Sequence, residues 1–374
     1  MALYDVYRLN SYLLEDPGRI NIRRMVTLQQ IATLAGVSTA TVSHVLSGKH
    51  KVSPRLQARV MKVVKDFNYQ PNDFARSLKT NRSKTVGMVV TDMTNPFYGA
   101  AVRGAENVLA REGYTLLVGN SDEDYAKEES YYRVFRAKRT EGIIIVTCPT
   151  PYPPSYLLQH VIEEMPVVIL NRDYPALQAD SVIADNFEGS YQAVCHLLRL
   201  GHQRIGIITG QHNNIVAARR LQGYERALTD HRLVCEPDLI HEGNFADPRT
   251  GYSAAKKVLT MKNRPSALFV CNVRMTTGAL RGIHELGLEV PRELALVSFD
   301  DEEWFQCTRP RISGVAQPAF ELGVQAAQVL MDRIKGKLPN TPCRKVLKTE
   351  LKVRESSDRQ FSGDGNEVRL SEAS

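Results

Sequence analysis

The body of the chain, from about residue 85 to about residue 354, alternates continuous apolar runs with segments of helical pattern. Seven of these runs read as strands, at residues 85–90, 115–119, 142–147, 167–170, 204–209, 267–271 and 294–299. Strands that are apolar along their whole length are typical of parallel sheets covered by helices on both faces. About 270 residues of this pattern therefore predict an α/β fold with two doubly wound lobes.

Polar residues follow several of the predicted strands. Asn95, Asn171 and Asp300 come after the first, fourth and seventh runs, and Asp185 and Asn272 stand at similar places. In doubly wound sheets a ligand binds outside the carboxyl ends of the strands, so these positions predict a ligand site. An Asn or Asp there can also cap the following helix, and this alternative stays open for Asp185 and Asn272.

A different pattern precedes the body, at residues 26–46. Two short helical patterns are separated by Ala-Gly-Val-Ser, and Thr27 with Gln30 forms a capping-box start for the first. Gly36 suits the turn between them, and Ser38 can cap the second. Two helices joined by so short a turn predict a helix-turn-helix, whose second helix fits the major groove of DNA. The alternative is a helical hairpin that only packs against other parts of the chain.

The charge distribution supports a nucleic-acid partner. The chain carries a formal net charge of +7. Residues 1–84 hold 14 basic and 5 acidic residues, a balance of +9, whereas the rest hold 34 and 36. A small basic module on a near-neutral body is the electrostatic pattern expected of nucleic-acid binding.

A third helical pattern and a polar segment follow the helix pair. Ser53 and Pro54 begin this helix. Its expected buried stripe consists of Leu56, Val60, Val63, Val64 and Phe67. Residues 69–84 are polar and basic and too short to form a stable helix in water. We interpret them as a linker that becomes helical when it docks on DNA.

Residues 26–78 resemble the headpiece and hinge of the lactose/galactose repressor (LacI/GalR) family. The matching pieces are V-T-L, I-A, A-G-V-S, T-V-S, V-L-S and Y-Q-P-N…A-R-S-L, in the family's order and spacing. The resemblance continues to about residue 355. It implies a bacterial transcription regulator with a helix-turn-helix headpiece and a two-lobed core like that of periplasmic binding proteins. It further implies a homodimer that binds a double-stranded DNA operator, is controlled by a sugar-like effector and uses no cofactor.

The resemblance assigns roles to residues of the headpiece and hinge. Thr39, Ala40 and His44 are expected to approach base edges. The residues expected to hold phosphates are Thr27, Ser38, Thr41 and Ser43, and those expected to bind DNA from the hinge are Asn72, Ala75 and Leu78. Leu78 resembles the family's minor-groove wedge. Two alternatives stay open: His44 as an exposed side chain without a base partner, and Leu78 as a linker residue covering a domain joint.

The resemblance also implies an effector site between the lobes. It places there Asn95, Phe97, Tyr98, Asn171, Arg220, Phe245, Asn272 and Asp300, with Gln317 as a weaker candidate. Amide, carboxylate and guanidinium groups suit the hydroxyls of a sugar, and aromatic rings pack on its apolar faces. Arg220 pairing with a surface carboxylate and Phe245 as ordinary core are the alternatives.

The chain departs from the family pattern near this site. Asn171 and Val273 stand where relatives often carry Asp, and Arg274 follows directly. These changes make the expected pocket less acidic. They lead to the hypothesis of an effector with negative charge, such as a sugar acid or a sugar phosphate.

Two other function classes fit the sequence less well. A secreted sugar-binding protein needs an export signal, and residues 1–24 lack an apolar core of sufficient length. An enzyme is not indicated, because G-x-G-x-x-G, Walker, H-E-x-x-H and G-x-S-x-G motifs are absent. The six cysteines are dispersed without a C-x-x-C pair, which argues against zinc and for a reducing compartment. The sequence also holds no transmembrane run. We therefore expect a cytoplasmic protein that binds no metal.

These patterns divide the chain into five segments: an N-terminal extension at 1–24, the helix-turn-helix domain at 25–68, the hinge at 69–84, the effector-binding and dimerisation domain at 85–354, and a disordered tail at 355–374. The extension has no counterpart in the family pattern, and we expect it not to be a functional arm. The tail lacks the apolar heptads that a tetramerising helix needs, which favours a dimer.

Overall fold

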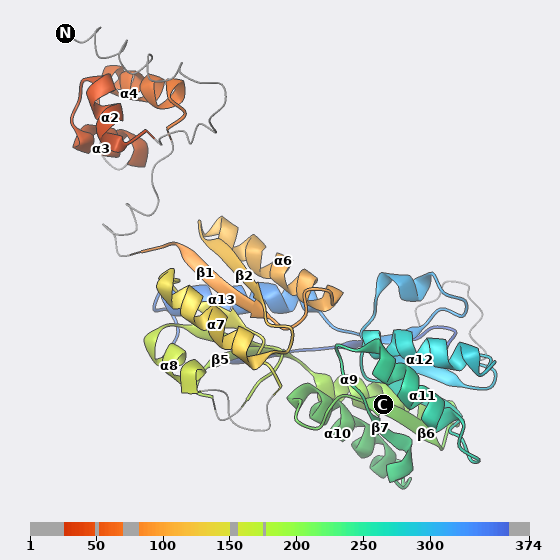
Figure 1. The fold of residues 1–374 in the computed structure, drawn as a ribbon. Helices are drawn as coiled ribbons and strands as arrows, with labels where there is room; N and C mark the ends of the chain where they lie inside the picture. The colour runs from red at the N-terminus through yellow and green to blue at the C-terminus, as the bar shows by residue number, and fades with distance from the viewer. Residues whose placement is uncertain (1–25, 49–51, 70–81, 150–155, 175–176, 359–374) are drawn as a thin grey trace, which may run out of the picture. The chain divides into compact units, whose positions relative to one another are not determined.

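The computed structural model describes residues 26–48, 52–69, 82–149, 156–174 and 177–358. The chain divides into two compact units between Asn81 and Arg82 (Figure 1). We call the described part of the first unit, residues 26–69, the headpiece, and that of the second, from residue 82 onward, the body.

The headpiece contains the helices α2 (Leu28–Ala35), α3 (Thr39–Ser47) and α4 (Pro54–Asp66). The Thr27 N–H donates to Gln30 Oε1 at 2.9 Å and the Gln30 N–H to Thr27 Oγ1 at 3.3 Å, so the predicted capping box is confirmed. Gly36 ends α2 with φ of 58°, a conformation that favours glycine. The small core is built from Ile31, Ala32, Ala35, Val42, Val45 and Val60.

Two expectations for the end of the headpiece were wrong. Phe67 is 41% exposed, because α4 ends at Asp66 and Phe67 is its C-terminal cap rather than part of the buried stripe. Tyr69, predicted to begin the hinge, packs on the headpiece core, and its N–H donates to the Val64 carbonyl at 2.9 Å. The headpiece therefore extends to Tyr69, and residues 70–81 of the predicted hinge lie outside the described residues.

The first lobe of the body is a six-stranded parallel sheet in the order β11-β5-β4-β3-β1-β2. The strands are β1 (Thr85–Val90), β2 (Thr115–Asn120), β3 (Ile143–Ile145), β4 (Val167–Leu170), β5 (Asp180–Ala184) and β11 (Arg344–Leu347). Helices α6 (Pro96–Arg111) and α13 (Ala319–Ile334) share one core, and α7 (Tyr125–Ala137) and α8 (Tyr156–Glu164) share another. A β-carbon at Gly104 would lie 2.1 Å from the Phe320 carbonyl oxygen, so glycine is what lets α6 and α13 pack this closely.

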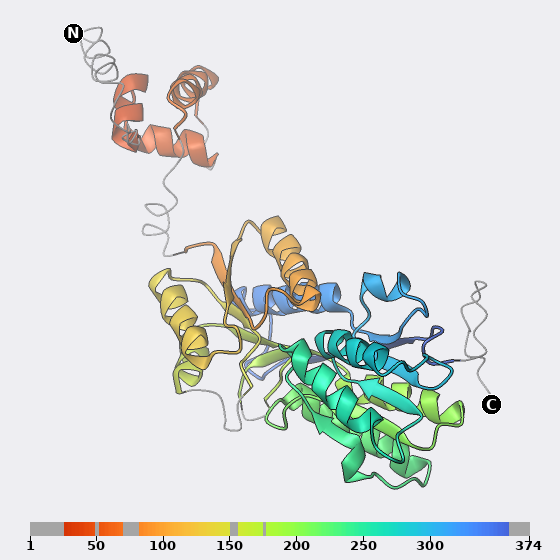
Figure 2. The ribbon, with the colours of Figure 1, turned by 45° about the vertical axis from the view of Figure 1, so that its right-hand side comes forward.

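The second lobe is a six-stranded sheet in the order β12-β10-β9-β8-β6-β7, parallel except for β12. Its strands are β6 (Ile205–Thr209), β7 (Ile240–Glu242), β8 (Ala267–Val270), β9 (Ala295–Phe299), β10 (Ser313–Ala316) and β12 (Glu350–Lys352). Its helices are α9 (Asn186–Arg199), α10 (Ile215–Asp230), α11 (Pro248–Leu259) and α12 (Val273–Glu285), with short 3-10 turns at η1 (Pro237–Leu239) and η2 (Glu303–Gln306). Helix α9 packs beside α10, and α11 beside α12 (Figures 1 and 2).

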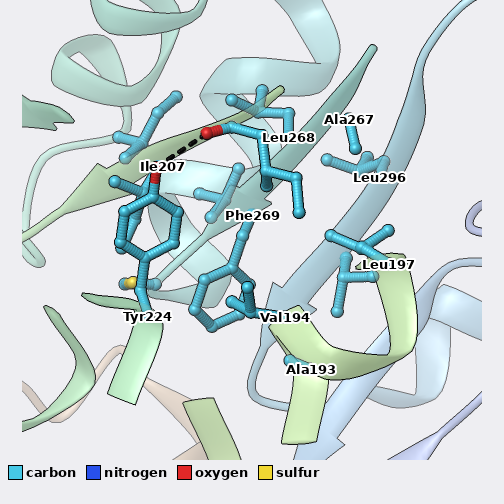
Figure 3. Packing of buried hydrophobic residues seen from close by; sticks show 14 of the residues in the cluster. Ala193, Val194, Leu197, Ile207, Tyr224, Ala267, Leu268, Phe269 and Leu296 are labelled. Carbon is cyan, nitrogen blue, oxygen red and sulfur yellow. Dashed lines mark hydrogen bonds between the residues drawn. The ribbon is translucent and has the colours of Figure 1, made fainter. Parts of the chain in front are cut away.

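In the core of the second lobe, apolar side chains of the helices pack against those of the sheet (Figure 3). Tyr224 of α10 is fully buried beside Phe269 of β8, and its hydroxyl donates to the Ile205 carbonyl of β6 at 2.8 Å. Val194 and Leu197 of α9 belong to the same cluster. This packing holds the carboxyl ends of β6, β8 and β9 in fixed positions. The side chains that directly follow these strands are therefore held in place as well.

The chain passes between the lobes after β5, after β10 and after β11, so neither lobe is a continuous segment. All seven predicted runs are strands, and the predicted two-lobed α/β fold is confirmed. Strands β5, β7, β10, β11 and β12 are not among these seven runs, because their three to five residues include polar side chains and so do not form a continuous apolar run.

The predicted limits of the body need correction at both ends. Arg82 Nη2 donates to Glu141 Oε2 at 2.9 Å, so residues 82–84 belong to the body rather than to the hinge. Residues 355–358 were assigned to a disordered tail, but Ser356 is buried and its hydroxyl donates to the Leu296 carbonyl at 2.6 Å. Glu355 pairs with Arg311 at 2.7 Å. Residues 359–374 lie outside the described residues.

Candidate functional site

Helix α3 presents Thr39, Ala40 and His44 on the side away from the headpiece core. Val42 and Val45 are buried, Ala40 and His44 are exposed, and Thr39 is partly exposed. Helical spacing separates these two sets, because residues three or four apart share a face. The three residues predicted to approach base edges therefore lie on an accessible surface.

The four residues predicted to hold phosphates lie at the start of α2 and on the first half of α3. They are Thr27, Ser38, Thr41 and Ser43. Ser38 Oγ accepts a hydrogen bond from the Thr41 N–H at 3.1 Å, and α3 has no acidic residue in its first turn. A helix N-terminus of this kind attracts phosphate through its free N–H groups and its dipole. The predicted DNA-binding residues Asn72, Ala75 and Leu78 lie outside the described residues.

One cavity between the lobes brings together all nine residues predicted for the effector. Its volume is about 430 Å³, including the part that is open to solvent. The first lobe contributes Asn95, Phe97, Tyr98 and Asn171, the second contributes Arg220, Phe245, Asn272 and Asp300, and Gln317 lies where the chain crosses between them. That these residues bind an effector stays a prediction at this point.

The cavity has five further lining residues that were not predicted, namely Asp92, Glu123, Arg172, Val216 and Ala246. Arg172 and Ala246 directly follow the predicted Asn171 and Phe245 in the sequence. Their position next to these residues is the feature from which they could have been predicted. Glu123 comes from the loop after β2 and had no signal of its own.

Arg172 is buried, and its charge is balanced inside the first lobe. Its Nη1 and Nη2 donate to the two carboxylate oxygens of Glu123 at 2.8 and 2.6 Å, and Nη1 also donates to the Thr147 carbonyl at 2.8 Å. Burial by itself would lower the pKa of Arg172, but Tyr98 and Glu123 raise it above its ordinary value. The guanidinium therefore stays charged and paired, which makes it a wall of the cavity rather than an open anion site.

Arg220 is also buried, but one of its nitrogens remains unused. Its Nε donates to Asn186 Oδ1 at 2.9 Å and its Nη1 to the Cys271 carbonyl. Its guanidinium lies 3.5 Å from the centre of the Phe299 ring and 5.5 Å from that of Phe245. Burial lowers the pKa of Arg220. Nη2 has no hydrogen-bond partner among the described residues, so it can donate to a ligand.

Two buried acceptor oxygens complete the pattern. Asn171 Oδ1 and Gln317 Oε1 are both without a hydrogen-bond partner in the part of the chain that the structure describes. An unsatisfied buried acceptor costs about 1–3 kcal/mol, and a ligand hydroxyl would remove that cost. Asp300 lies beside them, where its Oδ1 accepts from Gln317 Nε2 at 2.5 Å and its Oδ2 from the Val273 N–H at 3.1 Å.

The helix-cap alternative is correct for Asp185 and Asn272. Asp185 Oδ1 accepts from the Glu188 N–H at 3.1 Å and is not part of this cavity. Asn272 Oδ1 accepts from the Arg274 N–H at 2.9 Å and still lines the cavity, as does Asn95, the cap of α6. In both Asn residues the cap bond uses the carbonyl oxygen and holds the side chain in one orientation.

Arg274 does not bring an unbalanced positive charge to the cavity. Its Nη1 lies 3.1 Å from Asp92 Oδ2 and also donates to Thr94 Oγ1, so it links α12 in the second lobe to the loop after β1 in the first. The charged residues lining the cavity are Asp92, Glu123, Arg172, Arg220 and Asp300, with no positive excess. Arg274 therefore gives no support to an effector of negative charge, because Asp92 balances its charge.

The other chemistry of the described residues is limited. All six cysteines are free thiols. No group of three or more His, Cys, Asp or Glu side chains in the described ranges is placed to hold a metal ion. None of the helices described combines the length and apolar character needed to span a membrane.

Comparison with known proteins was decisive for the family. Residues 27–72 match the family model of the bacterial regulatory proteins, lacI family, and residues 194–357 match that of the periplasmic binding protein-like domain. The chain is 35% identical over 313 residues to the HTH-type transcriptional repressor PurR of Aliivibrio salmonicida, which covers 84% of this chain and 93% of that protein. The chain belongs to the lacI family of bacterial regulatory proteins.

Other lacI-family relatives agree over most of the chain. The ribose operon repressor of Haemophilus influenzae is 34% identical over 333 residues, covering 89% of this chain and 98% of that protein. The crystal structure of the lac repressor dimer bound to operator and the anti-inducer ONPF matches with a TM-score of 0.82 and 25% identity, over 89% of this chain and 99% of that one. This lacI-family chain is accordingly a DNA-binding transcription regulator and not an enzyme.

Proposed function

We propose that this chain is a dimeric repressor that binds a pseudo-palindromic operator through α3 and is controlled by a neutral sugar or sugar derivative held between the lobes of the body. The observation that carries the effector assignment is the cavity in which Asn171 Oδ1, Gln317 Oε1 and Arg220 Nη2 lack partners among the residues that the structure describes. The proposed repressor acts in the cytoplasm, where its operator is found.

The headpiece supports the DNA-binding half of the proposal. In this role α3 enters the major groove, with Thr39, Ala40 and His44 toward base edges and the helix N-terminus toward the phosphates. Thr39 and Ala40 offer methyl groups to thymine, and His44 donates to a guanine acceptor. The lac repressor neighbour was solved as a dimer bound to operator, which supports one headpiece per half-site.

The hinge completes this half of the proposal. Residues 25–69 form the DNA-binding domain, and the hinge at 70–81 connects it to the effector-binding and dimerisation domain at 82–358. Asn72, Ala75 and Leu78 bind DNA from this hinge, with Leu78 as a wedge in the minor groove.

The cavity supports the effector half. Two acceptors and one guanidinium nitrogen without partners in the described ranges, together with the Asp300 carboxylate, match hydroxyl groups, each of which both donates and accepts. Phe97, Tyr98 and Phe245 supply apolar surface for the faces of a sugar ring. A transcriptional regulator CelR–cellobiose complex, 30% identical with a TM-score of 0.67, shows a sugar bound to a similar protein.

The geometry of the cavity supports a coupling between effector binding and DNA binding. Because the cavity walls belong to both lobes, an effector stabilises one degree of lobe closure over another and shifts the population competent for DNA binding. By thermodynamic reciprocity, operator and effector change each other's affinity by the same factor.

Operator selection with the purified full-length chain tests the proposal. Random duplex DNA is enriched for bound sequences, and operator affinity is then measured with and without each member of a sugar panel. We expect a pseudo-palindrome bound at least about 10³-fold more tightly than random DNA. One sugar should change that affinity by about 5- to 150-fold. Binding without sequence preference would contradict the first half of the proposal, and an operator affinity that no sugar changes would contradict the second.

A further inference from the structure

A second cleft adjoins the effector cavity. It measures about 840 Å³, including the part open to solvent, against about 430 Å³ for the effector cavity. Asn171 and Val216 line both spaces. These two residues lie at the boundary between the two spaces, so a molecule too long for the effector cavity would meet the second cleft beyond them.

The walls of the second cleft also come from both lobes. The first lobe contributes Asp173 after β4 and Val346 in β11. The second lobe contributes Phe187 in α9 and Ile215 and Arg219 in α10. An occupant would contact both lobes. Its binding would therefore favour lobe closure in the same way as a molecule in the effector cavity.

The lining is mixed in character. Ile215, Phe187 and Val346 offer apolar surface, and Val346 is 46% exposed. Arg219 donates to Gln222 Oε1 at 3.2 Å and forms no ion pair with the residues that the structure describes. Asp173 pairs with Arg344 at 2.6 Å.

This lining distinguishes between kinds of occupant. The cleft's charged lining residues are two arginines and two aspartates, namely Arg219, Arg344, Asp173 and Asp185. Their charges cancel, so the cleft has no net positive charge to attract an anion. A purely apolar group would take water from Arg219 and both carboxylates without replacing its hydrogen bonds. A sugar unit satisfies both kinds of surface, since its hydroxyls donate and accept and its C–H face packs on rings and aliphatic side chains.

A buried group at the junction points to the same occupant. Asn171 is 7% exposed, lines both spaces, and its Oδ1 has no partner within the described ranges. A hydroxyl near the link between two sugar units would donate to this oxygen and so mark the junction.

We propose that the effector is a disaccharide, with its first unit in the effector cavity and its second unit in the second cleft against Phe187 and Arg219. This inference rests on the proposed sugar effector and names its size. Phe187 and Arg219 then determine specificity for the second unit, while Arg220 and Asp300 hold the first.

Calorimetric titration of the full-length chain tests the inference. The panel pairs glucose, galactose and fructose with disaccharides that contain them, namely maltose, cellobiose, lactose, melibiose and sucrose, and adds glucose 6-phosphate as an anionic probe. We expect at least one disaccharide to bind about tenfold or more tightly than either of its monosaccharides.

Variants separate the second cleft from the effector cavity. Arg219→Ala and Phe187→Ala should each remove most of the gain of the disaccharide and leave the affinity for its first monosaccharide within about twofold. Arg226→Ala is the matched control, because Arg226 lies on the same helix, is exposed and pairs with Asp230 outside the cleft. It should change neither affinity.

The failures are distinguishable. A monosaccharide that binds as tightly as every disaccharide containing it would overturn this inference and leave the proposed sugar effector standing. Tightest binding of glucose 6-phosphate would replace the second sugar unit by an anion and overturn it as well. A panel without any binder would overturn the sugar effector itself and this inference with it.

Discussion

Helix α3 and the effector cavity both offer polar side chains to a ligand, but they are assembled differently. The surface of α3 comes from the nine consecutive residues Thr39–Ser47, which one helix displays by its own periodicity. The residues lining the cavity extend from Asp92 to Gln317 and come from both lobes. A substitution on α3 can therefore change one contact and leave the others in place. The cavity, in contrast, exists only when the two folded lobes meet.

The two regions also differ in how firmly their side chains are held. On α3 the proposed base-contacting residues Ala40 and His44 are exposed. In the cavity, Asn95 and Asn272 are held as helix caps, and Arg220 is held by Asn186 and the Cys271 carbonyl. Prearranged side chains lower the entropic cost of binding, so single changes in the cavity should cost more than single changes on α3.

The largest expected effect comes from Arg220→Lys. A lysine ammonium cannot reproduce the planar fork that reaches Asn186 and Cys271 and stacks on Phe299. Loss of charge-assisted hydrogen bonds to the effector should weaken its binding about 100-fold. Operator affinity without effector should stay within about threefold. Calorimetry with the sugar found in the panel measures the first quantity, and fluorescence anisotropy with labelled operator the second.

Arg226→Lys on the exposed side of α10 is the control for this prediction, and thermal unfolding checks that both variants fold. An unchanged effector affinity in Arg220→Lys would remove Arg220 from the site and break the contrast between a rigid cavity and a permissive helix.

The next effect is expected from His44→Ala on α3. Loss of one single hydrogen bond to a base, rather than a bidentate pair, should reduce discrimination at one operator position by about 1 kcal/mol, which is about fivefold. Effector affinity should not change, because the contact is local to the headpiece. Competition binding against operators with single base changes measures the effect, with Gln57→Ala on the exposed side of α4 as control. Equal loss on all DNA sequences would instead assign His44 to the backbone.

A smaller effect is expected from the ion pair that joins the lobes. Arg274 and Asp92 are 30% and 16% exposed and 3.1 Å apart, so we expect a coupling of about 0.5–1 kcal/mol between them. Arg274→Gln and Asp92→Asn should each weaken effector binding about two- to fivefold, and the double variant should be no weaker than the single ones. Titration of the four proteins gives the coupling directly.

Arg281→Gln is the matched control for the interlobe pair, because it breaks an ion pair with Glu285 within a single lobe. Fully additive effects of Arg274→Gln and Asp92→Asn would show that the pair does not bias lobe closure.

The smallest effect concerns pH and Glu302, next to the cavity residue Asp300. Burial, then Asp300 and Asp301, raise the pKa of Glu302 to about 7. A raised pKa in the folded state means that this group stabilises the fold most below its ordinary pKa of 4.5, and that the stabilisation is lost as pH rises through 7. Glu302→Gln should therefore match the parent protein in Tm at about pH 4 and exceed it at about pH 8. The exposed neighbour variant Glu303→Gln should show no such difference, and an equal response of both variants would refute the assignment.

Much of this molecule could be predicted from its sequence, and the reasons are local. The seven apolar runs, the capping box at Thr27 and the turn at Gly36 depend on neighbours a few residues away, so their patterns survive in the linear chain. Phe67 shows where this reasoning ends, since helical periodicity predicted burial but α4 stops one residue earlier.

The membership of the cavity was predicted from family resemblance rather than from local pattern. The ion pairs within the cavity could not be predicted from the sequence. Arg172 pairs with Glu123, 49 positions away, and Arg274 pairs with Asp92, 182 positions away. The hypothesis of a negatively charged effector rested on Asn171, Val273 and Arg274 together, and only the position of one lobe against the other shows that Arg274 has a partner in Asp92.

The sequence by itself determined the two-lobed α/β fold, the helix-turn-helix and the residues that α3 displays, because each follows from periodicity and caps within a short segment. The tertiary structure decided which charges are neutralised, which acceptors are left without partners, and that a second cleft adjoins the first at Asn171. These properties depend on how separate strand ends are brought to one edge of each sheet, and that arrangement is set by the packing of both lobes together.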